Sequence, residues 1–338
     1  MRLSSLGDIL HTLPAYQSLR RAFPHSEIGW LVEKRTSFLL SVVSGIDSLH
    51  VIDTRGPRET PWAPWQWLPI LRTMRELRRR KYDLAIDFQG LLKTALLSRL
   101  SGAPRRIGFG ASLVRERPAH WFYNRVLGKG EPPGHVVDLN LSLAGLAGVA
   151  PAAERIRFQP GAPDVEAVTS LLRKAQLSEY AVINPGGGWK TKIWKTEKYG
   201  AVVRALHDRL QLPVVITTGP GEEWMFERIA CHCGPANPVH AHVPFLQLIP
   251  LYARARLVIA GDTGPLHLAC ALGTPVVGLY GPSSPHRNGP WHTRSEVVYR
   301  ELPCSFCYGR TCPTQNECMD LEIAEVLEAV CRCLGKAG

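Results

Sequence analysis

Residues 257–273 read LVIAGDTGPLHLACALG: a short apolar run, a turn bounded by glycines, and a second apolar run that stops at Gly273. The first run is typical of a strand buried on both faces, and the second is typical of a helix. Pro265 suits the first position of that helix, because a proline lacks the N–H that would have no partner there. The stretch therefore predicts a strand–turn–helix unit of a parallel α/β sheet.

Units of the same kind recur on both sides of this stretch. In the second half of the chain, the apolar patterns predict strands at 180–184, 213–218, 257–260 and 275–280, and helices at 165–174, 197–210, 222–230 and 266–272. In the first half they predict strands at 27–32, 50–52, 82–87 and 105–109, and helices at 9–21, 70–80 and 91–100. Strands that alternate with helices indicate a parallel α/β sheet in each half.

Residues 150–164 are rich in Pro, Ala and Gly and separate the two alternating halves. We therefore expect two α/β domains, at 1–155 and 165–320. A C-terminal helix within 321–338 follows them and can pack back on the first domain. A chain of 338 residues, 45% of them hydrophobic, is large enough for two globular domains, so disorder is not expected to dominate.

The beginning of the chain limits the first strand. Only three residues precede the turn at 4–8, whereas a core strand usually has about five or six. We therefore expect the first strand to be short or truncated. The chain has neither a signal-peptide pattern nor an apolar run of about 18 residues, so we expect a cytoplasmic protein without a membrane-spanning helix.

The net charge of +11 favours a polyanionic partner over a mere aid to solubility, because the basic residues cluster. The basic cluster follows three tryptophans; it comprises Arg72, Arg75, Arg78, Arg79, Arg80 and Lys81, after Trp62, Trp65 and Trp67. This composition suits a membrane-interface segment, and equally an amphipathic helix that packs its aromatic side chains. No nucleic-acid-binding motif occurs, so nucleic acid is not the expected partner.

Three predicted strand ends in the second half are rich in glycine, and ligands bind at strand ends in parallel sheets. Asp262, Thr263 and Gly264 open a helix whose free N–H groups favour an anion such as phosphate. His267 falls in the first turn and can donate to a phosphate oxygen. Alternatively, Asp262 only caps the helix. The loop matches neither the dinucleotide fingerprint nor the P-loop of nucleotide triphosphatases.

The second glycine-rich loop, at 186–188, precedes Lys190, Lys192 and Lys195. A flexible backbone with compact positive charges suits a diphosphate. A solvated basic turn has the same composition. Two such loops in one half of the chain favour the phosphate interpretation.

Carboxylates follow two further turns. Glu222 and Glu223 come after the glycine-rich residues 219–221, where a carboxylate can accept from both hydroxyls of a ribose or simply complement a helix dipole. Asp8 follows Gly7, and an aspartate at a helix start is most often a cap. Asp8 becomes a candidate general base only if it faces the donor site across a cleft.

All nine cysteines lie after residue 230, and an odd number without a signal peptide argues against a disulfide framework. Four have the spacing C-x2-C-x4-C-x5-C: Cys304, Cys307, Cys312 and Cys318. This spacing can bind zinc or an iron–sulfur cluster. We favour reduced or disulfide-linked thiols and expect no metal.

Several segments, in this order along the chain, resemble motifs of the bacterial lipopolysaccharide heptosyltransferases of glycosyltransferase family 9. The subgroup that the chain resembles is heptosyltransferase I. The segments are 4–14 (SSLGDILHTLP), 86–95 (IDFQGLLKTA), 115–116 (RE), 122–125 (FYNR), 135–137 (HVV), 192–194 (KIW) and 262–267 (DTGPLH).

The resemblance implies a GT-B fold, in which two Rossmann-like domains enclose an interdomain cleft. It implies an inverting, cofactor-independent transfer of heptose from ADP-L-glycero-D-manno-heptose to a Kdo sugar of lipid A. The expected partners are therefore a nucleotide sugar, a lipid A-type acceptor and the inner face of the inner membrane. Two alternatives stay open: a GT-B transferase that uses another nucleotide sugar, and a non-catalytic nucleotide-binding module.

The resemblance also implies roles for individual residues. Asp8 would deprotonate the acceptor hydroxyl, and Lys192 would neutralise charge on the donor phosphates as ADP leaves. The donor-binding positions would be Gly187, Gly188, Glu222 or Glu223, Asp262, Thr263, Gly264 and His267. The acceptor-binding positions would be Ser5, Lys93, Arg115 and His135.

Overall fold

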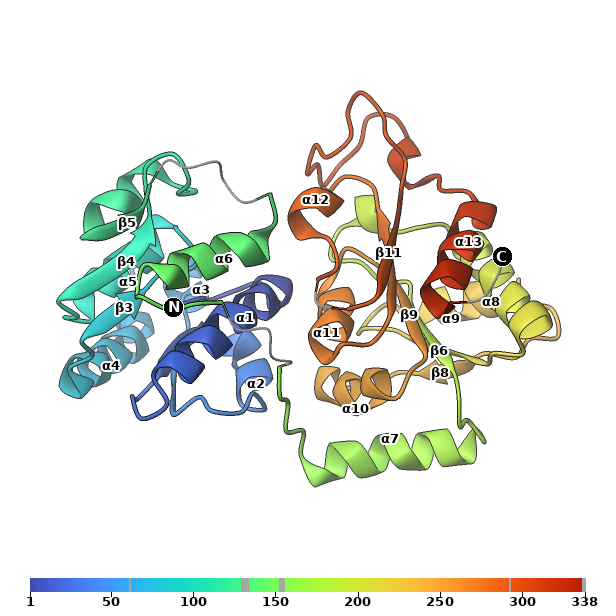
Figure 1. The fold of residues 1–338 in the computed structure, drawn as a ribbon, viewed down its shortest axis with the longest axis horizontal. Helices are drawn as coiled ribbons and strands as arrows, with labels where there is room; N and C mark the ends of the chain where they lie inside the picture. The colour runs from blue at the N-terminus through green and yellow to red at the C-terminus, as the bar shows by residue number, and fades with distance from the viewer. Residues whose placement is uncertain (61, 129–133, 152–155, 292, 336–338) are drawn as a thin grey trace. The chain divides into compact units, whose positions relative to one another are not determined.

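The computed structural model describes residues 1–338 except 61, 129–133, 152–155, 292 and 336–338 (Figure 1). The chain forms two compact units, Met1–Gln159 and Pro160–Gly338. The division between them falls inside the Pro-, Ala- and Gly-rich stretch 150–164. Each unit is an α/β fold whose strand ladders are parallel, which confirms the predicted class. None of the helices in the described ranges has the length and apolar character needed to span a membrane.

The second unit is built on one six-stranded sheet with the order β11-β10-β9-β6-β7-β8. Its strands are β6 (Ala181–Asn184), β7 (Val214–Thr217), β8 (Val239–Ala241), β9 (Leu257–Gly261), β10 (Val276–Tyr280) and β11 (Ser295–Tyr299). The four central strands are buried at every position, as their unbroken apolar runs predict. The strand order changes direction between β6 and β9, which is where ligands bind in sheets of this kind.

Helices separate the strands of this unit in sequence, and the central strands match the predicted positions. The helices are α7 (Ala162–Lys174), α8 (Thr196–Leu210), α9 (Glu223–Ala230), α10 (Leu248–Ala253), α11 (Gly264–Leu272), α12 (Pro285–Asn288) and α13 (Ile323–Leu334). Short 3-10 turns are η3 (Lys190–Lys192), η4 (Phe245–Gln247) and η5 (Glu317–Met319). The edge strands β8 and β11 were not predicted, because their burial is partial and their apolar patterns are weak.

The C-terminal helix α13 belongs to the second unit. Its buried face, Val326, Ala329, Val330 and Cys333, lies in the same hydrophobic core as the central strands. The helix packs against α8 and β11. The expectation that it packs back on the first domain is therefore wrong, because the core of its own unit already buries its apolar face.

The first unit contains two smaller parallel ladders. One pairs β1 (Gly29–Glu33) with β2 (Ser48–Ile52), and the other has the order β3 (Leu84–Ile86), β4 (Arg105–Phe109) and β5 (Arg125–Leu127). The helices are α1 (Leu6–Ala22), α2 (Ser37–Leu40), α3 (Arg55–Glu59), α4 (Pro64–Arg80), α5 (Leu92–Leu100) and α6 (Val136–Gly145), with 3-10 turns η1 (Lys34–Thr36) and η2 (Arg117–Phe122). Helix α4 begins six residues before the predicted start at 70, with Pro64 at its first position.

Residues 1–3 join these two ladders. The Met1 amino group donates to the Ile86 carbonyl at 2.6 Å, and the Phe88 N–H donates to the Met1 carbonyl at 3.1 Å, which is the bonding pattern of a parallel ladder. On the other side, the Glu33 N–H donates to the Leu3 carbonyl at 3.2 Å. Residues 1–3 thus connect β1 to β3 and place the following turn at the strand ends.

Candidate functional site

Two loops meet at the carboxyl ends of β6 and β9 in the second unit. These strands are hydrogen-bonded neighbours, with Asn184 opposite Ala260. The chain after β6 runs through a glycine-rich loop into η3, and the chain after β9 turns at residues 262–263 into α11. Strand pairing therefore brings together residues that are 70 positions apart in the sequence.

Asp262 is the centre of a buried charged cluster in this place. Its carboxylate accepts a hydrogen bond from Lys192 Nζ at 2.6 Å and one from His267 Nε2 at 2.9 Å. Lys192 Nζ also donates to the Asp262 backbone carbonyl at 3.0 Å. The Asp262 side chain is 5% exposed and that of Lys192 is 14% exposed, so the lysine keeps more access to solvent.

The charge state of Asp262 follows from these contacts. Burial by itself would raise the pKa of the Asp262 carboxyl, but the hydrogen bond from His267 and the charge of Lys192 outweigh it. The pKa is therefore held well below its ordinary value, and Asp262 is ionised at neutral pH. The carboxylate holds the Lys192 ammonium beside the first turn of α11, where free N–H groups favour an anion. This arrangement can bind a phosphate group.

The structure distinguishes the three lysines of the loop after β6. Only Lys192 contacts Asp262; Lys195 instead pairs with Asp320 at 3.0 Å and is exposed. Lys190 is exposed as well. A solvated basic turn therefore describes Lys190 and Lys195, whereas Lys192 is directed into the charged cluster.

Glu222 and Glu223 differ in the same way. The Glu222 carboxylate accepts hydrogen bonds from the N–H groups of Gly187, at 3.2 Å, and Gly219, at 2.9 Å. It therefore connects the loops that follow β6 and β7. Glu223 lies in the first turn of α9 and approaches His242 at 3.5 Å, with both side chains about half exposed. Glu222 is the glutamate at the strand ends.

Close approach to Glu222 explains one glycine of the loop after β6. A Cβ atom at Gly186 would lie 2.2 Å from Glu222 Oε2, so no larger residue fits there without a rearrangement. Gly188 is exposed and has open space around it. Thr263 donates to the Gly261 carbonyl at 3.2 Å and, with Gly264, begins α11. The loop after β6 therefore has no space for a side chain at Gly186, where Glu222 lies close, but has open space at Gly188.

Residues that were not predicted reach this site from the segment after β11. Thr191 Oγ1 donates to the Gly309 carbonyl at 2.8 Å, which ties that segment to η3. The Arg310 guanidinium lies 5.2 Å from the ring centroid of Trp189, and Lys192 Nζ lies 4.5 Å from the same centroid. Cation–π contacts of this kind contribute about 0.5–1 kcal/mol at exposed sites. No sequence signal pointed to Arg310, because its segment is distant in the chain and has no regular pattern.

The four-cysteine motif lies in this same segment. Cys304, Cys307 and Cys312 are exposed and Cys318 is buried, and all four are free thiols. Within the described ranges, no three His, Cys, Asp or Glu side chains are placed so that they could share a metal ion. Gly309 and Arg310, which lie between Cys307 and Cys312, contact η3 and Trp189.

In the first unit, Asp8 lies in the first turn of α1. Its carboxylate accepts from the Ser5 N–H at 3.0 Å and the Ser5 hydroxyl at 3.1 Å, and it pairs with Arg2 at 2.5 Å. Burial would raise the pKa of Asp8, but Arg2, the Ser5 N–H and Arg115 together lower it below its ordinary value. Asp8 is thus both a helix cap and an ionised carboxylate that remains 27% exposed.

The other two predicted acceptor residues lie on different elements of the first unit. His135 caps α6, since its Nδ1 accepts from the Val137 N–H at 3.2 Å, and its ring meets that of His11 edge-on at 6.0 Å. Lys93 lies on α5, and its Nζ donates to Thr54 Oγ1 at 3.4 Å. Ser5 and Arg115 are thus associated with Asp8, while Lys93 points elsewhere.

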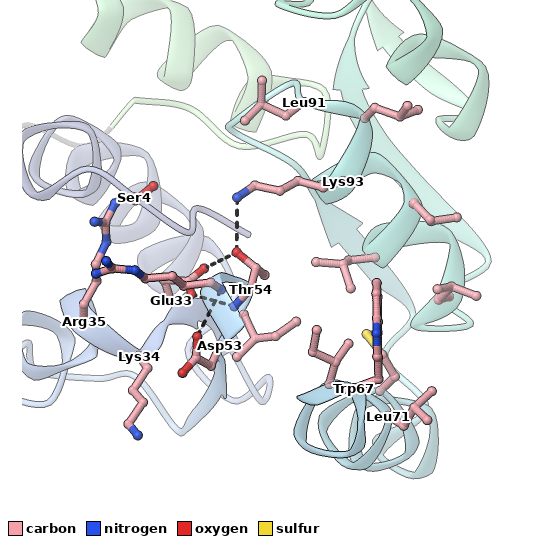
Figure 2. Close-up of a pocket in the computed structure, with 18 of the residues that line it drawn as sticks. Ser4, Glu33, Lys34, Arg35, Asp53, Thr54, Trp67, Leu71, Leu91 and Lys93 are labelled. Atoms are coloured by element: carbon pink, nitrogen blue, oxygen red, sulfur yellow. Dashed lines mark hydrogen bonds between the residues drawn. The ribbon is translucent and has the colours of Figure 1, made fainter. Parts of the chain in front are cut away.

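Lys93 points into a large hollow of the first unit, shown in Figure 2. The volume of the hollow is about 1730 Å³. Its lining combines Ser4 and the end of β1 with the facing sides of α4 and α5. Lys93 and Glu33 both bond to Thr54 there, while Trp67 and Leu71 line another part of the wall (Figure 2).

Comparisons with known proteins find related chains over most of this length. A family model described as glycosyltransferase family 9 (heptosyltransferase) matches residues 70–317. The lipopolysaccharide core heptosyltransferase OpsX of Haemophilus influenzae is 27% identical over 303 residues, covering 88% of this chain and 82% of that protein. Lipopolysaccharide heptosyltransferase 1 of Escherichia coli K12 is 30% identical over 302 residues, covering 84% and 88%. The solved structure of E. coli heptosyltransferase WaaC with ADP-2-deoxy-2-fluoro heptose has a TM-score of 0.72 at 26% identity, covering 90% and 95%.

Asp262→Asn tests the buried cluster. The substitution leaves the Lys192 charge without its partner, and breaking a buried pair in this way costs about 3–5 kcal/mol of unfolding free energy. Since the pKa of Asp262 is lowered in the fold, its contribution is complete above the ordinary carboxyl pKa of 3.8 and is lost as pH falls through the folded-state value. Thermal unfolding should show a large difference from the native chain at pH 7 that shrinks below pH 3.8. A difference that does not vary with pH would contradict this account.

Proposed function

This chain belongs to glycosyltransferase family 9, the heptosyltransferases of lipopolysaccharide core biosynthesis, and we propose that it transfers a heptose from ADP-L-glycero-D-manno-heptose to a Kdo sugar of lipid A. Its two parallel α/β units are of the GT-B type, as in the solved relatives. The observation that carries the proposal is the Lys192–Asp262–His267 cluster beside the first turn of α11. A site of this kind suits the diphosphate of a nucleotide sugar.

The donor would lie across the strand ends of the second unit. Its phosphates would accept hydrogen bonds from the N–H groups at Thr263 and Gly264 and from Lys192, while Gly187 and Gly188 leave room for the backbone to approach them. Glu222, rather than Glu223, would accept from the ribose hydroxyls; the position of its carboxylate beside the loops after β6 and β7 supports this choice. That WaaC was solved with an ADP-heptose analogue supports an ADP-linked donor here.

Transfer with inversion needs one base that accepts a proton and one group that stabilises the negative charge on the departing ADP. The acceptor hydroxyl oxygen attacks the anomeric carbon of the heptose and passes its proton to the Asp8 carboxylate. The bond between that carbon and the ADP oxygen breaks, and the Lys192 ammonium balances the negative charge that ADP gains. Asp262 keeps Lys192 in place through this step, and His267 keeps Asp262 in place.

The acceptor is proposed to bind the first unit. Ser5 and Arg115 lie at Asp8, and Lys93 and His135 would contact more distant parts of a phosphorylated acceptor. Trp62 and Trp65, which are 79% and 66% exposed, together with the basic side of α4, would hold the enzyme on the cytoplasmic face of the inner membrane.

Donor identity can be tested by thermal unfolding with a panel of nucleotide sugars. At about 100 times its dissociation constant, a ligand stabilises the fold by about 2.7 kcal/mol. ADP-heptose and ADP should raise the unfolding temperature, and uridine sugars should not. The reverse order would favour the alternative of a GT-B transferase with another donor. Membership of a glycosyltransferase family already sets aside a non-catalytic module.

Asp8→Asn tests the general base. Removing it should lower kcat by about 10²–10⁴-fold, while the affinity for ADP changes less than twofold because Asp8 lies in the other unit. The lowered pKa of Asp8 also predicts that the acid limb of the native pH–rate profile lies below pH 3.8. Asp138→Asn is the matched control, since Asp138 is an exposed acid in the first turn of α6. Equal activity of the two variants would rule out Asp8 as the base.

Lys192→Ala tests the phosphate contact, and Lys190→Ala is its control from the same loop. We expect Lys192→Ala to lower kcat by at least about 10²-fold, because it removes a charge that supports the transition state. Lys190→Ala should stay within about twofold of the native enzyme, since Lys190 is exposed and outside the cluster. Steady-state kinetics with ADP-heptose measure both. Similar losses in both variants would mean that the loop acts only through its total charge.

A further inference from the structure

Exposed apolar side chains gather on two helices of the first unit. On α4 they include Leu71, which is 51% exposed, and on α5 they include Leu96, which is 43% exposed. Single exposed leucines are common, but a contiguous apolar patch on a soluble unit marks a binding surface. These two helices therefore present an apolar surface that the described fold does not cover.

The patch is concave. From α4 the hollow is lined by apolar side chains such as Leu71 and Met74 and also by Arg75 and Arg78, and from α5 by apolar side chains such as Leu92 and Leu96. Its volume of about 1730 Å³ exceeds the range of about 300–1,000 Å³ that is usual for small-molecule sites. The hollow has room for an elongated apolar ligand and not only for a compact one.

Cations line the hollow as well. Lys34, Arg35 and Lys93 are among them, and no ion pair of Lys34 or Arg35 is found within the described part of the chain. Four carboxylates line the hollow too, and each has a partner: Glu33 accepts from Thr54, Asp53 accepts from the Arg55 N–H, Glu59 pairs with Arg55, and Glu116 accepts from the Leu92 N–H. Basic side chains outnumber these carboxylates in the lining, which favours anionic groups (Figure 2).

The part of the hollow that Ser4 lines also adjoins the proposed base. Ser4 lines the hollow, and the next residue, Ser5, donates its N–H and hydroxyl to Asp8. A ligand with an anionic, sugar-bearing head and apolar chains would thus have its head toward Asp8 and its chains between α4 and α5.

We propose that this hollow binds acyl chains of the acceptor lipid, with Lys34, Arg35 and Lys93 facing the phosphates of its head group. The inference rests on the proposed function, which supplies an acceptor with both parts. The apolar side chains of α4 and α5, together with the excess of basic over acidic side chains in the lining, match an anionic amphiphile. Burial of its chains adds affinity that the head group alone does not have. The hollow makes the lipid part of the acceptor a determinant of specificity.

The shape distinguishes this role from contact with a membrane surface. Trp65 and Leu68 are exposed on the same helix but do not line the hollow. A membrane would contact such outward side chains at least as well as those inside the concavity. An acyl chain in the hollow would contact Leu71 and Leu96 but not Trp65 or Leu68.

The test compares an acylated Kdo–lipid acceptor with its deacylated head group, both in steady-state transfer and in direct binding by calorimetry. For the native chain, the acylated acceptor should have a KM and a dissociation constant at least about tenfold lower. In the variant Leu71→Glu/Leu96→Glu this advantage should disappear, while the values for the deacylated head group stay within about twofold. Two new carboxylates at exposed positions should leave the unfolding temperature little changed.

The matched control is Leu68→Glu/Trp121→Glu, which adds two carboxylates at exposed apolar positions outside the hollow. It should keep the preference for the acylated acceptor. Equal losses in the two double variants would overturn the proposal in favour of membrane contact, and equal affinity of the native chain for both acceptors would overturn it outright. If neither acceptor receives heptose, the proposed function fails, and the calorimetric comparison still decides whether the hollow binds acyl chains.

Discussion

The buried ion pair between Lys192 and Asp262 is the interaction on which the proposed donor site depends. A carboxylate that is almost fully buried is costly unless it is paired and hydrogen-bonded, and here Lys192 and His267 supply both requirements. The pair exists only because β6 and β9 are neighbours in the sheet. The pairing of β6 with β9 therefore brings the two loops together, and the contact between the loops decides which charges can face a phosphate.

A comparable constraint operates in the first unit, where the Asp8 carboxylate caps the start of α1 and also forms an ion pair with Arg2. Residues 1–3 connect β1 to β3, so the turn that follows them is held at the strand ends. Arg2 comes from this short segment and balances the charge of Asp8. The helix-cap and general-base interpretations of Asp8 are therefore compatible, because the contacts that cap α1 also keep its carboxylate ionised and partly open to solvent.

Much of the fold could be predicted because its elements carry local signals. The central strands β6, β7, β9 and β10 are continuous apolar runs, and their positions followed directly. Edge strands such as β8 and β11 were missed, since partial burial weakens their patterns. The packing of α13 was predicted wrongly, because an amphipathic helix shows that it has a buried face but not which core that face joins.

The sequence by itself determined that the chain forms two parallel α/β units, that phosphate-type loops follow strands in the second, and which family its motifs resemble. These properties depend on residue patterns a few positions long. Only the tertiary structure decided which of three lysines meets Asp262, which of two glutamates lies at the strand ends, and that Arg310 reaches Trp189. Neighbouring residues of the same type have nearly the same local conformational preferences, so the sequence does not distinguish them. They take different roles only when strand order places one of them beside a partner that is distant in the chain.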